Sequence, residues 1–186
     1  SGFIGYSHFP VEIMDCIHIG TITYVDSSSY LYHDSGFINA NGPSVTNPQL
    51  NHKIAISNCI NASSKPNAAD FGTAFVSDVD GYRAIYGESP SKLYYDSTKW
   101  GGVPSDYGFT IDGKSTSELC KLTTDELSAN WSCVIDETRY PLPDLSLVLD
   151  ESIWQEICYA AKVEVSSGGG EDEITNVSKF EKYILK

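Results

Sequence analysis

Basic residues and methionine are scarce in this sequence. Its 186 residues include 12 Lys and Arg against 25 Asp and Glu, which gives a net charge of −13 at pH 7, and only 1 Met. Nucleic acids and anionic membrane surfaces are bound through basic patches, so we expect neither as a partner. An acidic exterior is typical of a soluble protein, and it also suits divalent cations.

Long apolar runs are missing as well. No stretch approaches the ~20 apolar residues that a membrane-spanning helix needs, and no signal peptide is recognisable. We therefore expect no membrane insertion by this chain. The sequence opens inside a repeat, which suggests that it is a piece of a longer protein.

Catalytic and metal-binding signatures are also lacking. The sequence has no G-x-S-x-G, no H-E-x-x-H and no phosphate-binding loop. Zinc needs three or four converging ligands, whereas the 4 histidines are scattered and only His8 and His18 suit neighbouring strands. We therefore predict no catalytic residues, no metal site and no cofactor.

The 5 cysteines include no C-x-x-C pair. Cys16 and Cys59 occupy equivalent positions in the repeat described next, and we predict that both are inward-facing thiols stacked in the core, because free cysteine packs as a small hydrophobe. Burial argues against a nucleophilic role, which needs an exposed, reactive thiol. The sequence leaves the disulfide state of Cys120, Cys133 and Cys158 open, including a bridge between the first two.

What the sequence does contain is an internal repeat. Each copy has a Gly-containing start before apolar residues, followed by a strand that in two copies contains Asp-Cys-Ile or Asn-Cys-Ile. The copies lie at residues 1–4 with 15–17, 35–38 with 58–60 and, more weakly, 71–76 with 93–97. Gly2, Gly36 and Gly72 are 34 and 36 residues apart. Such a period indicates stacked β-coils, each of which buries its apolar face against the next.

The composition changes after the repeats. Capping boxes at residues 115–118 and 123–126 predict two short helices. Their apolar sides carry three leucines, Leu119, Leu122 and Leu127. Pro141 and Pro143 cannot donate to a β ladder, so we expect them to end the stack, whose open edge otherwise exposes strands and apolar side chains.

This pattern divides the chain into segments. They are β-solenoid repeats with a C-terminal cap at 1–143, a strand-rich extension at 144–165, a flexible polar linker at 166–173 and the start of a following module at 174–186. Within the extension, the sequence of residues 145–149 is typical of a strand. Residues 152–157 are too few to decide between strand and helix.

Short motifs follow the repeats in a fixed order. They are Tyr94-Tyr95-Asp96, then Ser117-Glu118-Leu119 and Thr124-Asp125-Glu126-Leu127, then Trp131, and finally Arg139-Tyr140-Pro141-Leu142. Together with the two Ser-Gly-Phe-Ile repeats, this order resembles GLUG-motif repeats. Those repeats occur in large bacterial surface proteins, including adhesins and the non-catalytic regions of some immunoglobulin A-specific peptidases.

The resemblance covers about residues 1–143. The chain departs from the family pattern in having Ser-Gly for Gly-Gly and Cys-Ile for Cys-Tyr. The resemblance implies a right-handed β-solenoid with a C-terminal cap, located extracellularly or on the surface of a bacterium, and it implies no catalytic residues. We therefore predict a mainly β fold, a short right-handed β-solenoid with a small helical and strand cap.

We interpret the chain as a non-enzymatic module for adhesion to a host protein or glycan, or for presentation of neighbouring modules of the same chain. Exposed aromatic rings in loops can stack on sugar faces or fill protein hot spots. The candidate ligand-binding residues are Tyr30, Tyr32, Tyr82, Tyr86, Trp100 and Tyr107.

Two alternatives stay open. A β-helix polysaccharide lyase or glycoside hydrolase would use paired carboxylates, or acids that hold Ca²⁺. The candidate acids are Asp70, Asp78, Asp80, Glu88 and Asp96. A purely structural spacer would scatter its aromatic residues, whereas an adhesin would gather them in one exposed patch.

Overall fold

The computed structural model describes residues 4–7, 11–21, 35–40, 54–64, 75–78, 92–100, 110–135 and 138–163. Within these ranges the chain is rich in short strands and has two helices, so the predicted mainly β class is confirmed. The sheets are small, with two to four strands each. No helix in the described ranges is long and apolar enough to cross a membrane.

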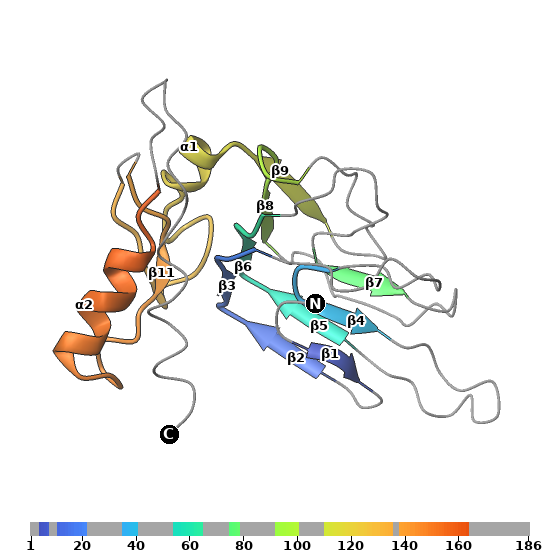
Figure 1. Ribbon diagram of the computed structural model, residues 1–186, viewed down its shortest axis with the longest axis horizontal. Helices are drawn as coiled ribbons and strands as arrows, with labels where there is room; N and C mark the ends of the chain where they lie inside the picture. The colour runs from blue at the N-terminus through green and yellow to red at the C-terminus, as the bar shows by residue number, and fades with distance from the viewer. Residues whose placement is uncertain are drawn as a thin grey trace.

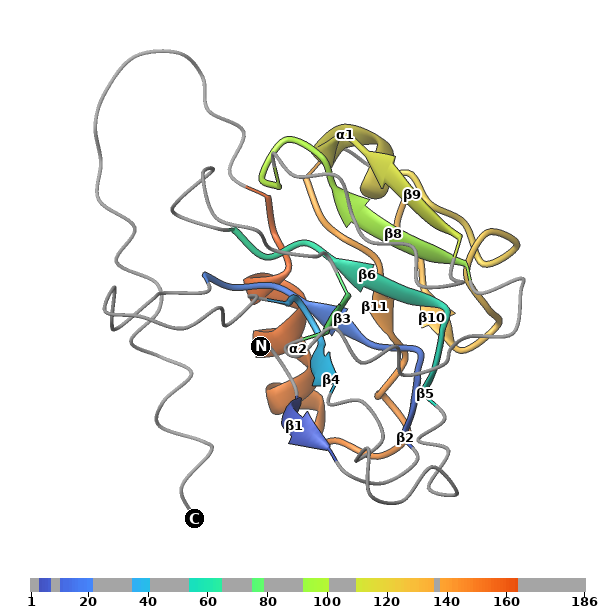
Figure 2. The same ribbon diagram turned by 90° about the vertical axis from the view of Figure 1, so that its right-hand side faces the viewer.

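Parallel pairing between successive repeats organises the strands. Three sheets are parallel throughout. The first holds β1 (Ile4–Ser7), β4 (Ile38–Ala40) and β7 (Val76–Asp78), and the second holds β2 (Val11–Met14) and β5 (Ile54–Ser57). The third holds β3 (Ile17–His18), β6 (Cys59–Asn61), β8 (Leu93–Asp96) and β9 (Ile111–Lys114), which lie in that order in Figure 2.

The strand register confirms the first two copies of the repeat and corrects the third. Ile38 pairs with Ile4 on one side and with Val76 on the other. The spacing of the glycines predicts that residue 74 pairs with Ile38. The observed partner, Val76, lies two residues later in the sequence. The ring centroids of the buried Phe37 and Phe75 lie 4.7 Å apart, so stacking of the apolar rings sets this register.

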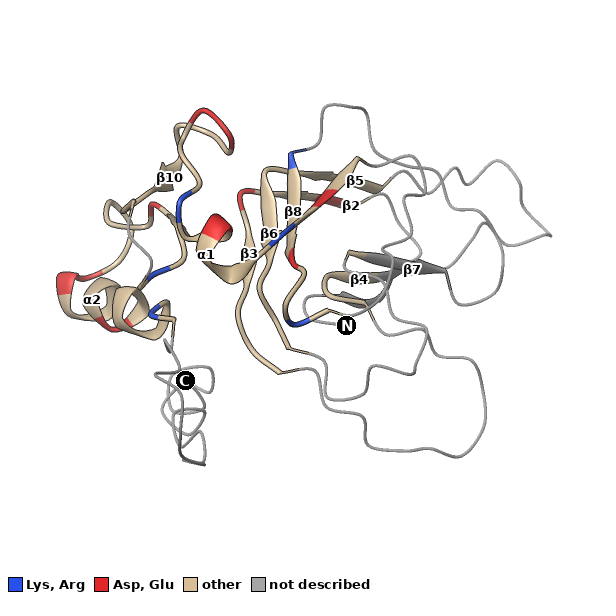
Figure 3. Ribbon diagram, turned by 90° about the horizontal axis from the view of Figure 1, so that it is seen from above, with Lys and Arg blue, Asp and Glu red and all other residues tan. Residues whose placement is uncertain are grey.

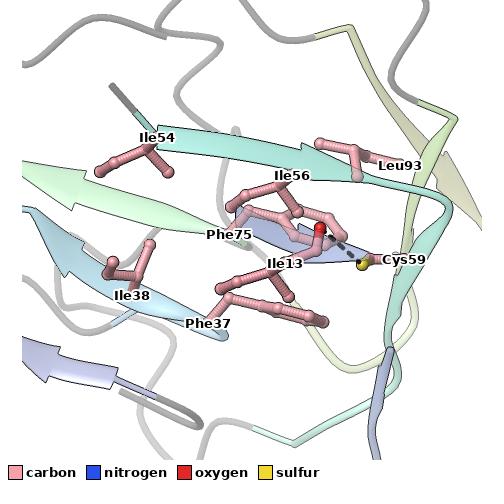
Figure 4. Close-up of a cluster of buried hydrophobic side chains, with 8 residues drawn as sticks. All are labelled: Ile13, Phe37, Ile38, Ile54, Ile56, Cys59, Phe75 and Leu93. Atoms are coloured by element: carbon pink, nitrogen blue, oxygen red, sulfur yellow. Dashed lines mark hydrogen bonds between the residues drawn. The ribbon is translucent and has the colours of Figure 1, made fainter. Parts of the chain in front are cut away.

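The main core lies between the parallel sheets. Figure 4 shows its side chains pointing toward one another from the strands of successive repeats. The buried members are Ile13, Phe37, Ile38, Ile54, Ile56, Cys59, Phe75 and Leu93. Because each repeat contributes only a few of these side chains, burial of the core depends on contact between neighbouring repeats.

Three residues with positive φ lie before strands of the third sheet, and the first two of them stand at the corner between the second and third sheets. They are Asp15, Asn58 and Lys92, with φ of 50°, 53° and 46°, and we call them the corner residues. Each stands one position before Cys16, Cys59 or Leu93. Asp and Asn adopt this left-handed conformation more readily than other non-glycine residues, whereas Lys92 has no such intrinsic preference.

The segment after the parallel sheets begins with α1 (Thr116–Leu119). Its predicted capping box is confirmed, since Glu118 N donates to Ser115 Oγ at 3.3 Å and Ser115 N donates to Glu118 Oε2 at 2.7 Å. In the second box, Thr123 N donates to Glu126 Oε2 at 3.0 Å, but these residues form a turn and not a helix. The three predicted apolar leucines are all buried.

A hairpin and a helix complete the described chain. β10 (Trp131–Ser132) pairs antiparallel with β11 (Leu142–Pro143), and α2 (Glu151–Ala160) follows. In Figure 1, α2 and β11 lie on one side of β3, β6 and β8, opposite the first two sheets. We call residues 115–143 the cap.

The prediction of a strand-rich extension at 144–165 is wrong, because α2 occupies its centre. The expected strand at 145–149 is a turn, in which Val148 N and Leu149 N each donate to Leu145 O at 3.0 Å. Leu147 is 95% exposed, so the apolar pattern of this turn does not reflect burial. Burial in this segment is provided by helix α2, whose Trp154 packs with Leu142. The linker and the following module lie outside the described residues.

Candidate functional site

A buried carboxylate joins the parallel sheets to the cap. Asp96, the last residue of β8, is 0% exposed. Its Oδ1 accepts hydrogen bonds from Thr98 N at 3.0 Å and Thr98 Oγ1 at 2.5 Å, and its Oδ2 accepts from Thr116 Oγ1 at 2.6 Å and Tyr140 Oη at 2.9 Å. A buried charge is tolerated only when it is paired and hydrogen-bonded. We call these four residues the Asp96 cluster.

Lys99 completes the surroundings of the Asp96 cluster. Its Nζ donates to Ala62 O at 3.0 Å and lies 5.2 Å from the centroid of the Tyr140 ring. Burial lowers the pKa of Lys99, and the charge of Asp96 acts in the opposite direction. Burial also raises the pKa of Tyr140, and the nearby Asp96 carboxylate raises it further. Tyr140 therefore stays a hydrogen-bond donor at neutral pH and is poorly suited to proton transfer.

Trp100 is not an exposed ligand-binding residue, and this prediction is corrected. Its side chain is 3% exposed, and its Nε1 donates to Ser63 O at 2.8 Å and to Ser63 Oγ at 3.2 Å. The tight turn after β8, in which Trp100 N donates to Asp96 O at 3.0 Å, folds the indole onto the preceding repeat. The other candidates, Tyr30, Tyr32, Tyr82, Tyr86 and Tyr107, lie outside the described residues.

Asp15 connects the first described repeat to the cap. Its Oδ1 accepts from Ser128 Oγ at 2.7 Å and from Trp131 Nε1 at 3.1 Å, and its Oδ2 accepts from Asn130 Nδ2 at 2.8 Å. Burial by itself raises the pKa of Asp15. The hydrogen bonds from these three residues and from Asn58 outweigh burial and lower the pKa.

Lys92 connects a later repeat to the same part of the cap. Its Nζ donates to Asp125 O at 2.9 Å and to Leu127 O at 2.8 Å, and Tyr94 Oη donates to Glu126 O at 3.1 Å. These contacts stabilise a lysine whose φ is otherwise unfavourable. Residues 125–131 of the cap therefore cover corner residues that belong to different repeats.

Replacing Asp15 with alanine is expected to destabilise the fold by about 1–2 kcal/mol, a value reduced for partial solvent exposure. Since the folded-state pKa of Asp15 is lowered, its contribution is present above the unfolded value of about 3.9 and is lost as the pH falls through the folded value. Urea denaturation at pH 7 and at pH 3 measures both effects. Glu12→Ala, an exposed acid of β2, is the control, and an equal loss in both variants would contradict the role of Asp15.

Cys16 and Cys59 lie side by side at the corner. Cys59 is 0% exposed, as predicted, while Cys16 is only half-buried and packs against the same core. A hydrogen bond from the Cys59 thiol lowers the pKa of Cys16 to about 7, although burial and the charge of Asp15 act to raise it. Burial, together with the contact to Cys16, raises the pKa of Cys59. All five cysteines carry thiols, so no bridge joins Cys120 to Cys133.

Cys59→Ala is expected to raise the pKa of Cys16 from about 7 toward the ordinary thiol value of about 8.5, because the variant loses the donor that stabilises the Cys16 thiolate. The pH dependence of Cys16 alkylation by iodoacetamide, followed by peptide mass spectrometry, measures this shift. The charged and titratable groups that act on Cys16 are Asp15 and Cys59. An unchanged midpoint would show that Cys59 does not stabilise the thiolate.

The acids of the enzyme alternative do not form a pair in the described structure. Asp96 is enclosed by its own hydrogen-bond donors, and the side chains of Asp70, Asp78, Asp80 and Glu88 lie outside the description. The described acidic residues are spread over the strands, the cap and α2 (Figure 3). Within the described ranges, no three His, Cys, Asp or Glu residues are grouped so that they could hold a metal ion.

Sequence reasoning missed most of this junction between sheets and cap. The ordered motifs contain Asp96, Trp131 and Tyr140. These motifs do not predict that Tyr140 donates a hydrogen bond to Asp96. Neither the residue type of Lys92 nor its sequence neighbours predict its positive φ.

Comparisons with known proteins found no relatives of this chain. No family model, no curated protein and no solved structure matches the chain. The resemblance to GLUG-motif repeats therefore depends on the short motifs and their order.

Proposed function

We propose that the chain is a non-enzymatic repeat module of a bacterial cell-surface or secreted protein, and that it presents neighbouring modules of the same chain. The repeats are proposed to form a short right-handed β-solenoid closed by the cap. Support for the solenoid comes from the in-order parallel pairing of successive repeats in the first and third sheets. In such a fold each repeat contacts mainly its neighbours.

The observation that carries the proposal is the convergence of the ordered motifs on one structural unit. Asp96 from the Tyr-Tyr-Asp motif accepts a hydrogen bond from Tyr140 of the last motif. Trp131 donates to Asp15 of the first described repeat. Each of these polar groups is engaged within the chain. An arrangement that uses its aromatic and acidic side chains in this way supports a load-carrying or spacing role better than catalysis.

The aromatic side chains of the described residues favour presentation over adhesion. Trp100, Trp131, Tyr140 and Trp154 are at most 8% exposed, whereas Tyr159 is 64% exposed. A sugar-binding face needs several exposed rings close together. Adhesion through the five tyrosines named as ligand candidates remains the second candidate function, and it is an outcome of the experiment that follows.

The test is a binding array of host glycans and matrix proteins probed with the purified chain, together with lyase and hydrolase assays in Ca²⁺. We expect no turnover and no saturable binding. Saturable binding that is lost in Tyr30→Ala or Tyr82→Ala but kept in the control Tyr159→Ala would replace presentation by adhesion. Measurable turnover of a polysaccharide would overturn the non-enzymatic assignment.

A further inference from the structure

The backbone brings Cys16, which immediately precedes β3, opposite Cys59 of the neighbouring strand β6. Met14 pairs with Ser57 before them and Ile17 pairs with Ile60 after them, at the same sequence offset. Ile60 N also donates to Cys16 O at 2.9 Å. Partners across neighbouring strands lie about 4.8 Å apart, and a disulfide needs Cα atoms about 4.4–6.8 Å apart. The backbone therefore already has the spacing that a disulfide requires.

The two sulfur atoms also point in the same direction. Cys16 Sγ lies 3.1 Å from Met14 O, and Cys59 Sγ lies 3.0 Å from Ser57 O, the equivalent carbonyl of the next repeat. The Cys59 thiol additionally donates to Ile13 O at 3.9 Å, the dashed line in Figure 4. Because the two side chains have the same orientation in neighbouring repeats, one thiol lies beside the other.

The two thiols differ in access to solvent and in charge. Cys16 is half-buried and can meet a small reagent, whereas Cys59 is enclosed in the core. The lowered pKa of Cys16, with the Cys59 thiol as donor, supplies a thiolate at neutral pH. A half-buried thiolate beside an enclosed thiol corresponds to the attacking and resolving positions of a dithiol that exchanges with disulfides.

We propose that Cys16 and Cys59 form a thiol–disulfide exchange site that reacts with low-molecular-weight disulfides and closes as a cross-link between neighbouring repeats. This site is independent of the proposed presentation function. It uses the registers of β2 with β5 and of β3 with β6, and no residue of the cap enters the reaction.

The reaction has two balanced steps. The Cys16 thiolate attacks one sulfur of the small disulfide, forms a mixed disulfide and releases one thiolate, which takes a proton from water. The Cys59 sulfur then attacks Cys16 Sγ while its proton passes to the departing thiolate, which forms the Cys16–Cys59 bond and releases the second small thiol. Two protein thiols are thereby oxidised and one small disulfide is reduced to two thiols.

The experiment treats the full chain with oxidised glutathione at neutral pH, quenches with acid and maps disulfides by mass spectrometry. We expect the Cys16–Cys59 link as the main product. Cys59→Ser is expected to stop at glutathione bound to Cys16, and Cys16→Ser is expected to leave Cys59 unmodified. A mixed disulfide at Cys16 that never resolves onto Cys59 in the unaltered chain would overturn the proposal.

A second measurement needs no variant and so does not depend on whether the variants fold. Cys16 and Cys158 are both half-buried, and burial raises the pKa of Cys158. Under limiting iodoacetamide, Cys16 is expected to react about tenfold faster than Cys158, because the thiolate is the reactive form. Equal rates for the two cysteines would also overturn the proposal.

Discussion

Asp96→Ala is expected to destabilise the chain by about 3–5 kcal/mol, the range found when one partner of a buried charged network is removed. The variant leaves three hydroxyl groups and the Thr98 amide without their acceptor. It also removes the negative charge that acts on the half-buried Lys99. Urea denaturation followed by tryptophan fluorescence measures the loss, and hydrogen exchange in the cap locates it.

Two further variants make this prediction specific to the hydrogen bonds of Asp96. Asp96→Asn keeps one acceptor oxygen and much of the shape, so a smaller loss of about 1–3 kcal/mol is expected. Asp112→Ala removes a more exposed carboxylate from the neighbouring strand of the same sheet, where it is 3.3 Å from Lys114 Nζ. Such surface ion pairs contribute about 0–1 kcal/mol. Equal losses for Asp96→Ala and Asp112→Ala would contradict the role given to the Asp96 cluster.

Phe37→Ala is expected to cost about 3–5 kcal/mol, the usual range for removing a buried phenylalanine side chain. Phe37 is 0% exposed, and its ring centroid lies 4.7 Å from that of Phe75 in the next repeat. The substitution leaves a cavity between two repeats and weakens burial of the core on both sides of it. The free energy of unfolding from urea denaturation gives the magnitude.

The control for Phe37→Ala is Leu147→Ala, because Leu147 is 95% exposed; its effect should stay within about 0.5 kcal/mol. In the double variant with Phe75→Ala, the two losses should fall short of additivity by about 0.5–1.5 kcal/mol, the value of an aromatic pair. Strict additivity would mean that the two rings do not stack in solution.

Features that depend on nearby residues were predictable from the sequence. The capping box at 115–118 spans three residues, and its hydrogen bonds form as expected. The Cys-Ile strands of the first two repeats pair as their repeated sequence predicts, with Ile17 opposite Ile60. In the third copy, the glycine spacing predicts a strand register that is two residues too early. The register follows the buried ring of Phe75 and not the glycine.

Features that depend on distant partners were not predictable. Trp100 stands beside a glycine-rich loop that suggests exposure, and only the fold reveals that Ser63 O accepts its indole hydrogen bond. Asp15 and Ser128 are 113 residues apart in the sequence, so no local pattern links them. Residues 145–149 are mostly aliphatic, as strand residues often are, yet they lie in a turn before a helix whose packing depends on Leu142.

The contacts of the cap with Asp15 and Lys92 limit how many repeats can lie between these two residues. Neighbouring parallel strands are about 4.8 Å apart, and a hydrogen bond tolerates a displacement of only a few tenths of an ångström. One additional or missing repeat between Asp15 and Lys92 would therefore break one set of contacts while the other is kept. The contacts of the cap therefore fit one number of repeats between Asp15 and Lys92.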